Sequence, residues 1–207
     1  MRVLVMTKIF PNAAEPLSAP FNRQQIAALG RRCEVEVLAP IPWFPGASLF
    51  SRWSSAGRLG TVPRHERIDG LEVAHPRTPY LPRFGHALSA ALYGAALYPV
   101  VRARRDRFDV LLGTWAYPDG VAAVALGRAM RLPTVVKLHG SDVNVIGREP
   151  GPRWMIPITT LIGTPTVTAP ARSRAIAFCG MGVSAGSSAA LLSTVVMGLS
   201  VSAYPGS

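Results

Sequence analysis

Short apolar runs alternate with longer segments of mixed character along the first two thirds of the chain. Residues 3–6 form a continuous β-prone apolar run, which is typical of a strand buried on both faces. Three further mainly apolar runs follow, at residues 35–38, 109–112 and 134–138, and each includes at least one polar residue. Before the second run, a helix is expected to begin at Asn22, because Asn is a good N-cap and Gln25 stands three residues later. Strand, helix and strand in this order predict a parallel pair with a right-handed crossover.

Two more helices are expected further along the chain. Residues 84–105 form a long helical stretch, which Pro99 should kink or break. Asp119 stands where it could cap a shorter helix over residues 120–130. The run at residues 109–112 lies between these two helices, and the run at residues 134–138 follows the second one, so strands and helices continue to alternate.

Turn residues mark the segments between these elements. A hairpin over residues 67–76 is expected to turn at Asp69-Gly70, a strong turn dipeptide. Residues 41–63 are rich in Pro and Gly and predict a loop. The aromatic residues of this loop could pack against the domain or form a contact surface, for instance at a membrane interface.

The repeated alternation of strand and helix predicts an α/β fold, with a Rossmann-like parallel sheet flanked by helices. In open sheets of this kind, ligands bind outside the carboxyl ends of the strands. The loops expected to matter for function are therefore residues 8–20, 113–119 and 139–142.

The chain is basic, with a formal net charge of +11. Such a charge could attract nucleic acid, an anionic membrane surface or phosphate-bearing substrates. The simpler explanation is an arginine-rich surface that is solvated and binds none of these. No basic motif interleaved with aromatics and no zinc-finger spacing is present, so no nucleic acid is expected. The first apolar run is too short for a signal peptide, which predicts a cytoplasmic protein. A peripheral contact with the inner face of the cell membrane stays open.

The composition changes after Glu149, because no Asp, Glu, Lys, His, Asn or Gln follows it. One explanation is that the chain from about residue 156 is frameshifted or truncated. The other is a membrane segment at residues 175–204, which is uncharged and longer than the roughly 20 residues that span a bilayer. We favour the first. The sequence therefore predicts one domain over residues 1–153 and an atypical, irregular low-charge tail over residues 154–207.

Several motifs carry a resemblance to one enzyme family. The string Val135-Val136-Lys137-Leu138-His139-Gly140-Ser141-Asp142-Val143 closely resembles the "HGSD" strand-to-loop motif of family 4 (group 1) glycosyltransferases. Other pieces fit the family in order and spacing: Arg2-Val3-Leu4-Val5 with Phe10-Pro11, the helix Phe21-Asn22-Arg23-Gln24-Gln25-Ile26-Ala27-Ala28-Leu29, and Phe108-Asp109-Val110-Leu111 with Tyr117-Pro118-Asp119-Gly120. The resemblance covers the chain from Met1 to about Arg153.

The resemblance implies the N-terminal half of a GT-B fold, in which two Rossmann-like domains face a cleft. The N-terminal domain of these enzymes binds a saccharide or lipid-linked acceptor. The C-terminal domain binds a nucleotide sugar, which is a co-substrate and not a cofactor. The family retains anomeric configuration and needs no metal. The chain as given has no acidic residue after Glu149 for the donor motif, so it is expected to be inactive alone.

Two other functions stay open. The chain could be a non-catalytic acceptor-binding module, or the subunit of a split glycosyltransferase that docks with a separate donor-binding domain. It could also be a membrane-anchored interaction protein that uses residues 175–204.

The resemblance places its most specific candidate residues after the strand at residues 134–138. His139 would lie at the cleft as the catalytic residue, in contact with the transferred sugar or its phosphate. Gly140 would let the backbone approach the substrate closely. Ser141 and Asp142 would line the same loop, where Asp142 could bond an acceptor hydroxyl. The alternative for such a His is a residue of the core or its rim.

Three further substrate-binding candidates lie in the preceding strand-end loop. Trp115 and Tyr117 could stack against a sugar ring, although packing explains them equally well. Asp119 is a candidate as well, and helix capping is its simplest explanation. No spacing among the histidines suggests a metal site; these are His65, His75 and His86.

Overall fold

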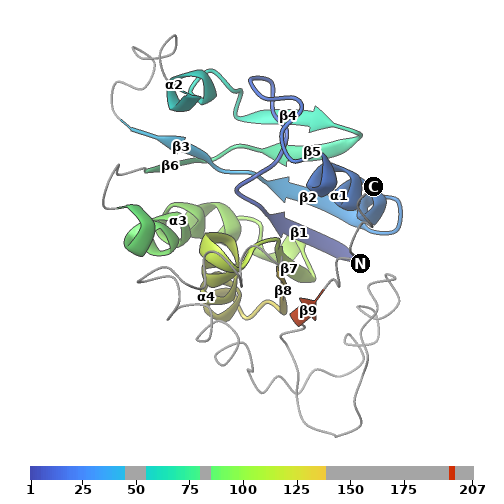
Figure 1. The fold of residues 1–207 in the computed structure, drawn as a ribbon. Helices are drawn as coiled ribbons and strands as arrows, with labels where there is room; N and C mark the ends of the chain where they lie inside the picture. The colour runs from blue at the N-terminus through green and yellow to red at the C-terminus, as the bar shows by residue number, and fades with distance from the viewer. Residues whose placement is uncertain (45–54, 80–84, 139–195, 199–207) are drawn as a thin grey trace, which may run out of the picture.

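The computed structural model describes residues 1–44, 55–79, 85–138 and 196–198 (Figure 1). One seven-stranded sheet has the strand order β4-β5-β2-β1-β7-β8-β9. Its strands are β1 (Arg2–Met6), β2 (Glu34–Leu38), β4 (His65–Ile68), β5 (Leu71–Ala74), β7 (Val110–Gly113), β8 (Thr134–Leu138) and β9 (Val196–Gly198). All neighbours pair in parallel except β4 and β5. The predicted α/β class with a Rossmann-like sheet is therefore confirmed.

Helices cover both faces of this sheet (Figure 1). They are α1 (Pro20–Gly30) on one face and α3 (Gly85–Arg102) with α4 (Val121–Met130) on the other. Alternate residues of β1 serve the two faces: Val3 and Val5 pack on the α1 side, and Leu4 and Met6 on the side of α3 and α4. A strand that is buried on both faces must be apolar throughout, which is why this run could be recognised in the sequence.

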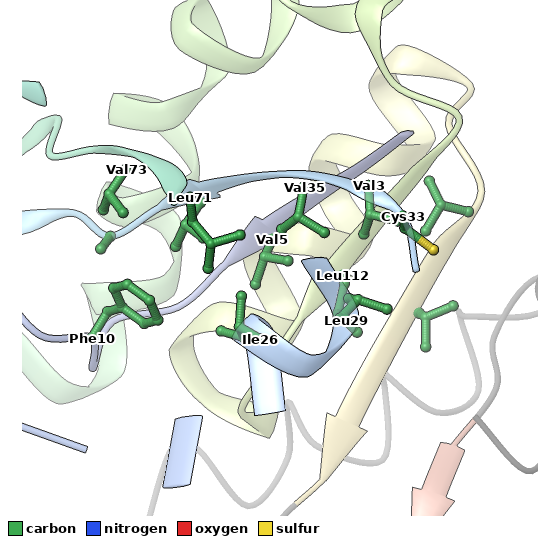
Figure 2. Packing of buried hydrophobic residues seen from close by; sticks show 14 residues of the cluster. Val3, Val5, Phe10, Ile26, Leu29, Cys33, Val35, Leu71, Val73 and Leu112 are labelled. Carbon is green, nitrogen blue, oxygen red and sulfur yellow. The ribbon is translucent and has the colours of Figure 1, made fainter. Parts of the chain in front are cut away.

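The α1 side of the core is shown in Figure 2. Ile26 and Leu29 of α1 lie in one buried cluster with Val5 and Val35 of the sheet (Figure 2). Burying aliphatic side chains contributes about 1.5–3 kcal/mol each relative to exposure, so this cluster fixes how α1 lies on β1 and β2. The first turn of α1 is thereby held beside the carboxyl end of β1.

The predicted hairpin is confirmed. β4 and β5 pair in antiparallel fashion, with Ile68 opposite Leu71. Asp69 and Gly70 both have positive φ, 51° and 80°, as the two central residues of a type I′ turn require. The Asp69 carboxylate also accepts two hydrogen bonds of 2.7 Å from the guanidinium of Arg23, which ties the hairpin to α1.

The predicted N-cap of α1 is wrong. The helix begins at Pro20, after Ala19 in the left-handed conformation, and no side chain caps it. Proline is tolerated at this position because the N–H that it lacks would have no hydrogen-bond partner within the helix. Asn22 lies inside the helix, and its side chain is buried against the loop that follows β1.

Two more predictions are corrected. Pro99 lies inside α3, which continues to Arg102, so the proline does not break the helix. The neighbouring Leu97 and Val101 are fully buried against the sheet, and this packing holds the helical path past Pro99.

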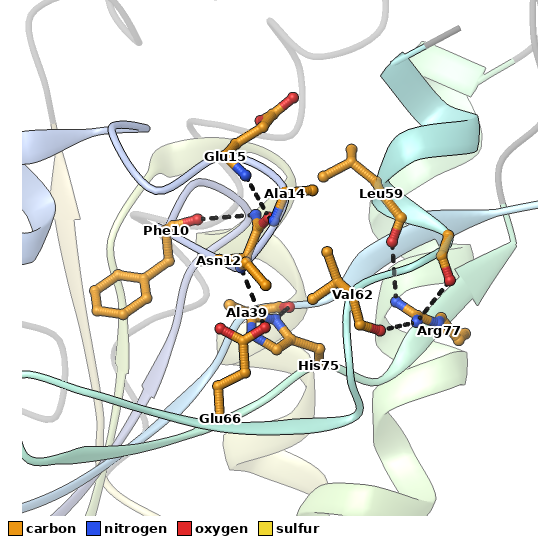
Figure 3. Close-up of polar contacts among 12 residues, drawn as sticks. Phe10, Asn12, Ala14, Glu15, Ala39, Leu59, Val62, Glu66, His75 and Arg77 are labelled. Carbon is orange, nitrogen blue, oxygen red and sulfur yellow. Dashed lines mark hydrogen bonds and ion pairs between the residues drawn. The ribbon is translucent and has the colours of Figure 1, made fainter. Parts of the chain in front are cut away.

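The segment at residues 41–63 is not all loop. It contains β3 (Ile41–Trp43), which pairs in parallel with β6 (Arg77–Pro79), and α2 (Ser55–Leu59). The guanidinium of Arg77 in β6 donates to the carbonyl oxygens of Leu59, Gly60 and Val62 (Figure 3). These contacts join β6 to a segment 15 or more residues away in the sequence, so a local sequence pattern cannot predict them.

The tail predicted for residues 154–207 lies outside the described residues apart from β9. Among the helices that the structure describes, none combines the length and apolar character needed to cross a membrane.

Candidate functional site

The strand order reverses direction between β1 and β7. From β1 the chain proceeds outward through α1 to β2 and β5, whereas from β7 it proceeds the other way through α4 to β8. Open α/β sheets bind ligands at the carboxyl ends of the strands that flank such a switch point. The segments that leave these two ends are residues 7–19 and residues 114–120, and two of the three predicted loops are therefore neighbours in space.

Asp119 joins these two segments. Its side chain is fully buried, at 0% exposure, and its Oδ2 accepts a 2.9 Å hydrogen bond from the backbone N–H of Lys8. The predicted capping role is wrong, since α4 begins without a side-chain cap. Burial raises the pKa of the Tyr93 hydroxyl in α3 well above its usual value, and the nearby negative charge of Asp119 raises it further. Asp119 therefore positions the loop after β1, and its substrate-binding role stays a prediction.

Tyr117 lies in η3 (Ala116–Gly120), the short kinked segment that links β7 to α4, and its peptide bond to Pro118 is cis. The ring is buried, and its hydroxyl accepts hydrogen bonds from Ser89 Oγ at 3.0 Å and from the Ala90 N–H at 3.4 Å, both in α3. In this conformation Tyr117 packs against α3 and offers no exposed face for a sugar ring.

Trp115 is the candidate that reaches the surface, because it is only partly buried. Its ring meets the ring of Phe21 in an edge-to-face contact, with centroids 6.2 Å apart and an interplanar angle of 65°. Phe21 lies in the first turn of α1 and is 42% exposed. The two aromatic residues connect the first turn of α1 to the segment after β7. No local sequence pattern marked Phe21 as part of the site.

The loop after β1 is held by its own side chains and by β4 (Figure 3). Asn12 Oδ1 accepts hydrogen bonds from the N–H groups of Ala14 and Glu15, at 3.0 and 2.9 Å. The Ala13 N–H donates to Glu66 Oε1 at 3.2 Å. These amides are already bonded, so the loop is held in a fixed shape.

A buried histidine stands behind Glu66 (Figure 3). His75 follows β5 directly, and its Nδ1 donates to the carbonyl oxygen of Ala39 at 2.8 Å. Its Nε2 lies 3.9 Å from Glu66 Oε1. Burial lowers the pKa of His75, although the carbonyl of Ala39 and the charge of Glu66 act in the opposite direction. His75 is therefore neutral near pH 7 and forms part of the core.

The residues predicted to carry catalysis lie outside the described residues. They are His139, Gly140, Ser141 and Asp142. The strand before them, β8, is the parallel neighbour of β7 and ends at Leu138 on the edge of the sheet where β7 ends. Their roles stay predictions.

A surface hollow lies elsewhere, between α1 and the hairpin turn. Its lining includes Arg23, Arg31 and Asp69. Arg23 lowers the pKa of the Asp69 carboxyl by hydrogen bonding, so the charges there already satisfy each other. This hollow is at the amino end of β5 and takes no part in the switch point. Within the described residues, no cluster of three or more His, Cys, Asp or Glu could hold a metal ion.

Comparison with known proteins points to one enzyme class. The chain is 26% identical over 147 residues to the "putative teichuronic acid biosynthesis glycosyltransferase TuaC" of Bacillus subtilis (strain 168). The alignment covers 70% of this chain and 38% of TuaC. The chain is thus a glycosyltransferase-like α/β protein that spans well under half the length of this relative. No family model matches the chain.

Two solved structures align with the chain at low scores. One is described as a "putative UDP-N-acetylglucosamine 2-epimerase" from Listeria monocytogenes, at 11% identity and a TM-score of 0.42, covering 76% of this chain and 37% of that one. The other is Arabidopsis thaliana UGT89C1 complexed with UDP, at 14% identity and a TM-score of 0.36, covering 77% and 43%. We draw nothing about activity from either.

Proposed function

We propose that this chain provides the acceptor-side domain of a retaining glycosyltransferase of family 4 (group 1). The reaction is the transfer of a sugar from a nucleotide sugar to a saccharide or lipid-linked acceptor. The observation that carries the proposal is the 26% identity to TuaC over 147 residues, a stretch long enough to take in most of the sheet. TuaC is described as a glycosyltransferase of teichuronic acid biosynthesis, so a saccharide acceptor is the first class to test.

In this proposal the switch point between β1 and β7 receives the acceptor. Trp115 supplies an aromatic surface for a sugar ring, while Asp119 holds the loop after β1 through its bond to Lys8. His139 contacts the transferred sugar or its phosphate, with Gly140, Ser141 and Asp142 beside it. The leaving diphosphate needs preorganised positive charge or donors, which the donor-binding domain would supply. No metal or cofactor is required.

A second candidate is an acceptor-binding module, or one subunit of a split glycosyltransferase with a separate donor-binding domain. A cytoplasmic location with a peripheral contact at the anionic inner face of the membrane fits the net charge of +11 under either candidate.

The test combines binding and transfer. The 207-residue chain is mixed with radiolabelled UDP-sugars and a panel of methyl glycosides and oligosaccharides, with and without the remaining part of TuaC as a separate chain. Transfer by the chain alone would reject the split-enzyme alternative, and transfer only with the added part would support it. Absence of both saccharide binding and transfer would overturn the proposal.

The anomeric configuration of any product gives a second readout. NMR of the new glycosidic linkage should show the configuration of the donor. An inverted product would contradict the assignment to family 4.

A further inference from the structure

Two buried threonines stand side by side where β1 and β7 end. β1 and β7 are parallel, with Met6 opposite Gly113, and the N–H of Thr114 donates to the Met6 carbonyl at 3.1 Å. Side chains alternate along a strand, so Thr7 and Thr114 continue the α1-facing series of Val5 and Leu112. Both threonines are buried, at 0% and 2% exposure. Their hydroxyls therefore lie under the first turn of α1.

The side chain of Asn22 in α1 contacts Thr7 at this end of β1. The side chain is 1% exposed, and its Nδ2 donates to the Ile9 carbonyl at 3.0 Å and to Thr7 Oγ1 at 3.4 Å. A carbonyl oxygen only accepts, so the contact with Ile9 fixes which side-chain atom of Asn22 is nitrogen. Asn22 Oδ1 therefore faces away from that bond.

Two polar atoms at this place lack a partner. Asn22 Oδ1 and Thr114 Oγ1 are buried, and neither has a hydrogen-bond partner among the described residues. Buried polar groups are nearly always bonded, because an unmade bond destabilises the folded state. Two such atoms at a topological switch point indicate that something outside the described chain bonds them.

Each of these two polar residues is next to an aromatic residue in the sequence. Phe21 precedes Asn22 and Trp115 follows Thr114, and the two rings touch edge to face. We call them the Phe21–Trp115 pair. Phe21 is 42% exposed, so the pair offers aromatic surface at this edge of the sheet.

The chemistry of the two atoms selects the ligand. Asn22 Oδ1 can only accept a hydrogen bond, so it needs an O–H or N–H donor. A phosphate or carboxylate group that is fully ionised offers none, and the buried carboxylate of Asp119 nearby in the same loops disfavours anions further. A neutral sugar ring offers several hydroxyl donors together with an apolar face for an aromatic ring.

We propose that Asn22 and Thr114 bind hydroxyl groups of the acceptor sugar, and that the Phe21–Trp115 pair opens to admit its ring. This inference rests on the proposed function and assigns the acceptor side of it to particular atoms. Asn22 Oδ1 accepts from one hydroxyl, Thr114 Oγ1 bonds a second, and an aromatic face of the pair covers the C–H face of the ring.

The decisive variant is Thr114→Val, which removes one hydroxyl and keeps the shape of the side chain. Because Thr114 Oγ1 has no partner among the described residues, the variant should unfold at the same or a higher urea concentration than the unaltered chain. Its affinity for the methyl glycoside or oligosaccharide that binds best, measured by calorimetry on the full chain, should fall about three- to tenfold.

Thr134→Val is the matched control. Thr134 begins β8 and is also buried, at 7% exposure, and its Oγ1 donates to the Leu132 carbonyl at 3.1 Å. This variant should lose stability and keep its saccharide affinity. Phe21→Leu keeps an apolar side chain without the ring, and should weaken saccharide binding about two- to tenfold through lost aromatic contact.

The outcomes separate the inference from the proposed function. If a saccharide binds the unaltered chain and Thr114→Val with equal affinity, the subsite is overturned and water occupies the two atoms, while the proposed function stands. If no saccharide binds and no transfer occurs even with the added part of TuaC, both are overturned. A loss of affinity in Thr114→Val and Phe21→Leu, with none in Thr134→Val, supports the subsite.

Discussion

At the edge of the sheet where β7 begins, arginines meet carboxylates. Arg2 bonds Asp109 at 3.1 Å, and Arg104 and Arg107 both reach Glu36, at 2.7 and 3.2 Å. At the opposite edge, where β1 and β7 end, the polar side chains are buried and mostly uncharged, and two of their atoms have no partner among the described residues. The first edge pairs its charged groups within the chain, whereas the second leaves two buried polar atoms without a partner among the described residues.

The difference follows from what each edge must do. The Arg2–Asp109 pair remains partly exposed, and pairs of this kind contribute little, about 0–1 kcal/mol each. Buried polar atoms without partners destabilise the fold, and a protein retains them where a ligand repays the loss. The contrast suggests that the amino edge of this sheet serves solubility and local order, while the carboxyl edge serves binding.

The largest effect is expected from Gly120→Ala, which tests how tightly the carboxyl edge is packed. A Cβ at Gly120 would lie 2.7 Å from the Trp115 carbonyl oxygen and 2.7 Å from Val136 Cγ1. Backbone must move to accept it, so the free energy of unfolding should fall by about 1–3 kcal/mol, measured in urea.

Gly94→Ala in α3 is the control for this substitution. Its Cβ would meet no atom closer than Ala122 Cβ at 3.7 Å, so helix propensity should stabilise the variant by about 0.5–1 kcal/mol. Equal stability of the two variants would show that the carboxyl edge is not tightly packed.

Asp119→Ala tests the bond between the two segments of the carboxyl edge. Without the buried carboxylate, the Lys8 N–H loses its 2.9 Å acceptor, and the free energy of unfolding should fall by about 1–3 kcal/mol. Asp119→Asn keeps an oxygen for Lys8 and should lose less. If both variants lose the same amount, the charge of Asp119 matters and its bond to Lys8 does not.

The pH dependence of stability tests the buried histidine beside the loop after β1. The pKa of His75 is lowered in the folded state, while Glu66 favours and Arg77 and His65 oppose its charged form. The unfolded chain therefore binds a proton first as the pH falls. Stability is full above the ordinary pKa near 6.5 and declines below it, with a slope of at most about 1.4 kcal/mol per pH unit.

His75→Asn is the matching variant, because its amide can still donate to the Ala39 carbonyl, as His75 Nδ1 does. Urea unfolding at pH 7.5 and pH 5.0 should show a smaller loss of stability on acidification in this variant. Parallel pH profiles for the two proteins would mean that His75 is protonated in the folded state.

The smallest effect is expected at the amino edge. Arg2 and Asp109 are 43% and 28% exposed, so a double-mutant cycle with Arg2→Gln and Asp109→Asn should give a coupling of about 0.2–1 kcal/mol. The coupling should shrink in 1 M salt, because exposed charges are screened. A larger, salt-independent coupling would remove the contrast between the two edges.

The sequence by itself determined the strands of the central sheet and the hairpin. β1, β2, β7 and β8 are mainly apolar because helices cover both faces of the sheet, so their pattern can be recognised without any partner. The turn at Asp69-Gly70 follows equally from local chemistry, since both residues tolerate positive φ. Because ligands bind outside the carboxyl ends of the strands in such sheets, the predicted strands also predicted which loops should bind a ligand.

The tertiary structure alone decided what the polar side chains in those loops do. Asn22 and Asp119 both looked like helix caps, because a cap depends only on neighbouring residues. Asp119 instead bonds Lys8, 111 residues away, and Asn22 bonds Ile9 across the gap between α1 and β1. A hydrogen bond between distant segments depends on how strands align in the sheet, and that alignment is set by the burial of the whole core, which no local stretch of sequence contains.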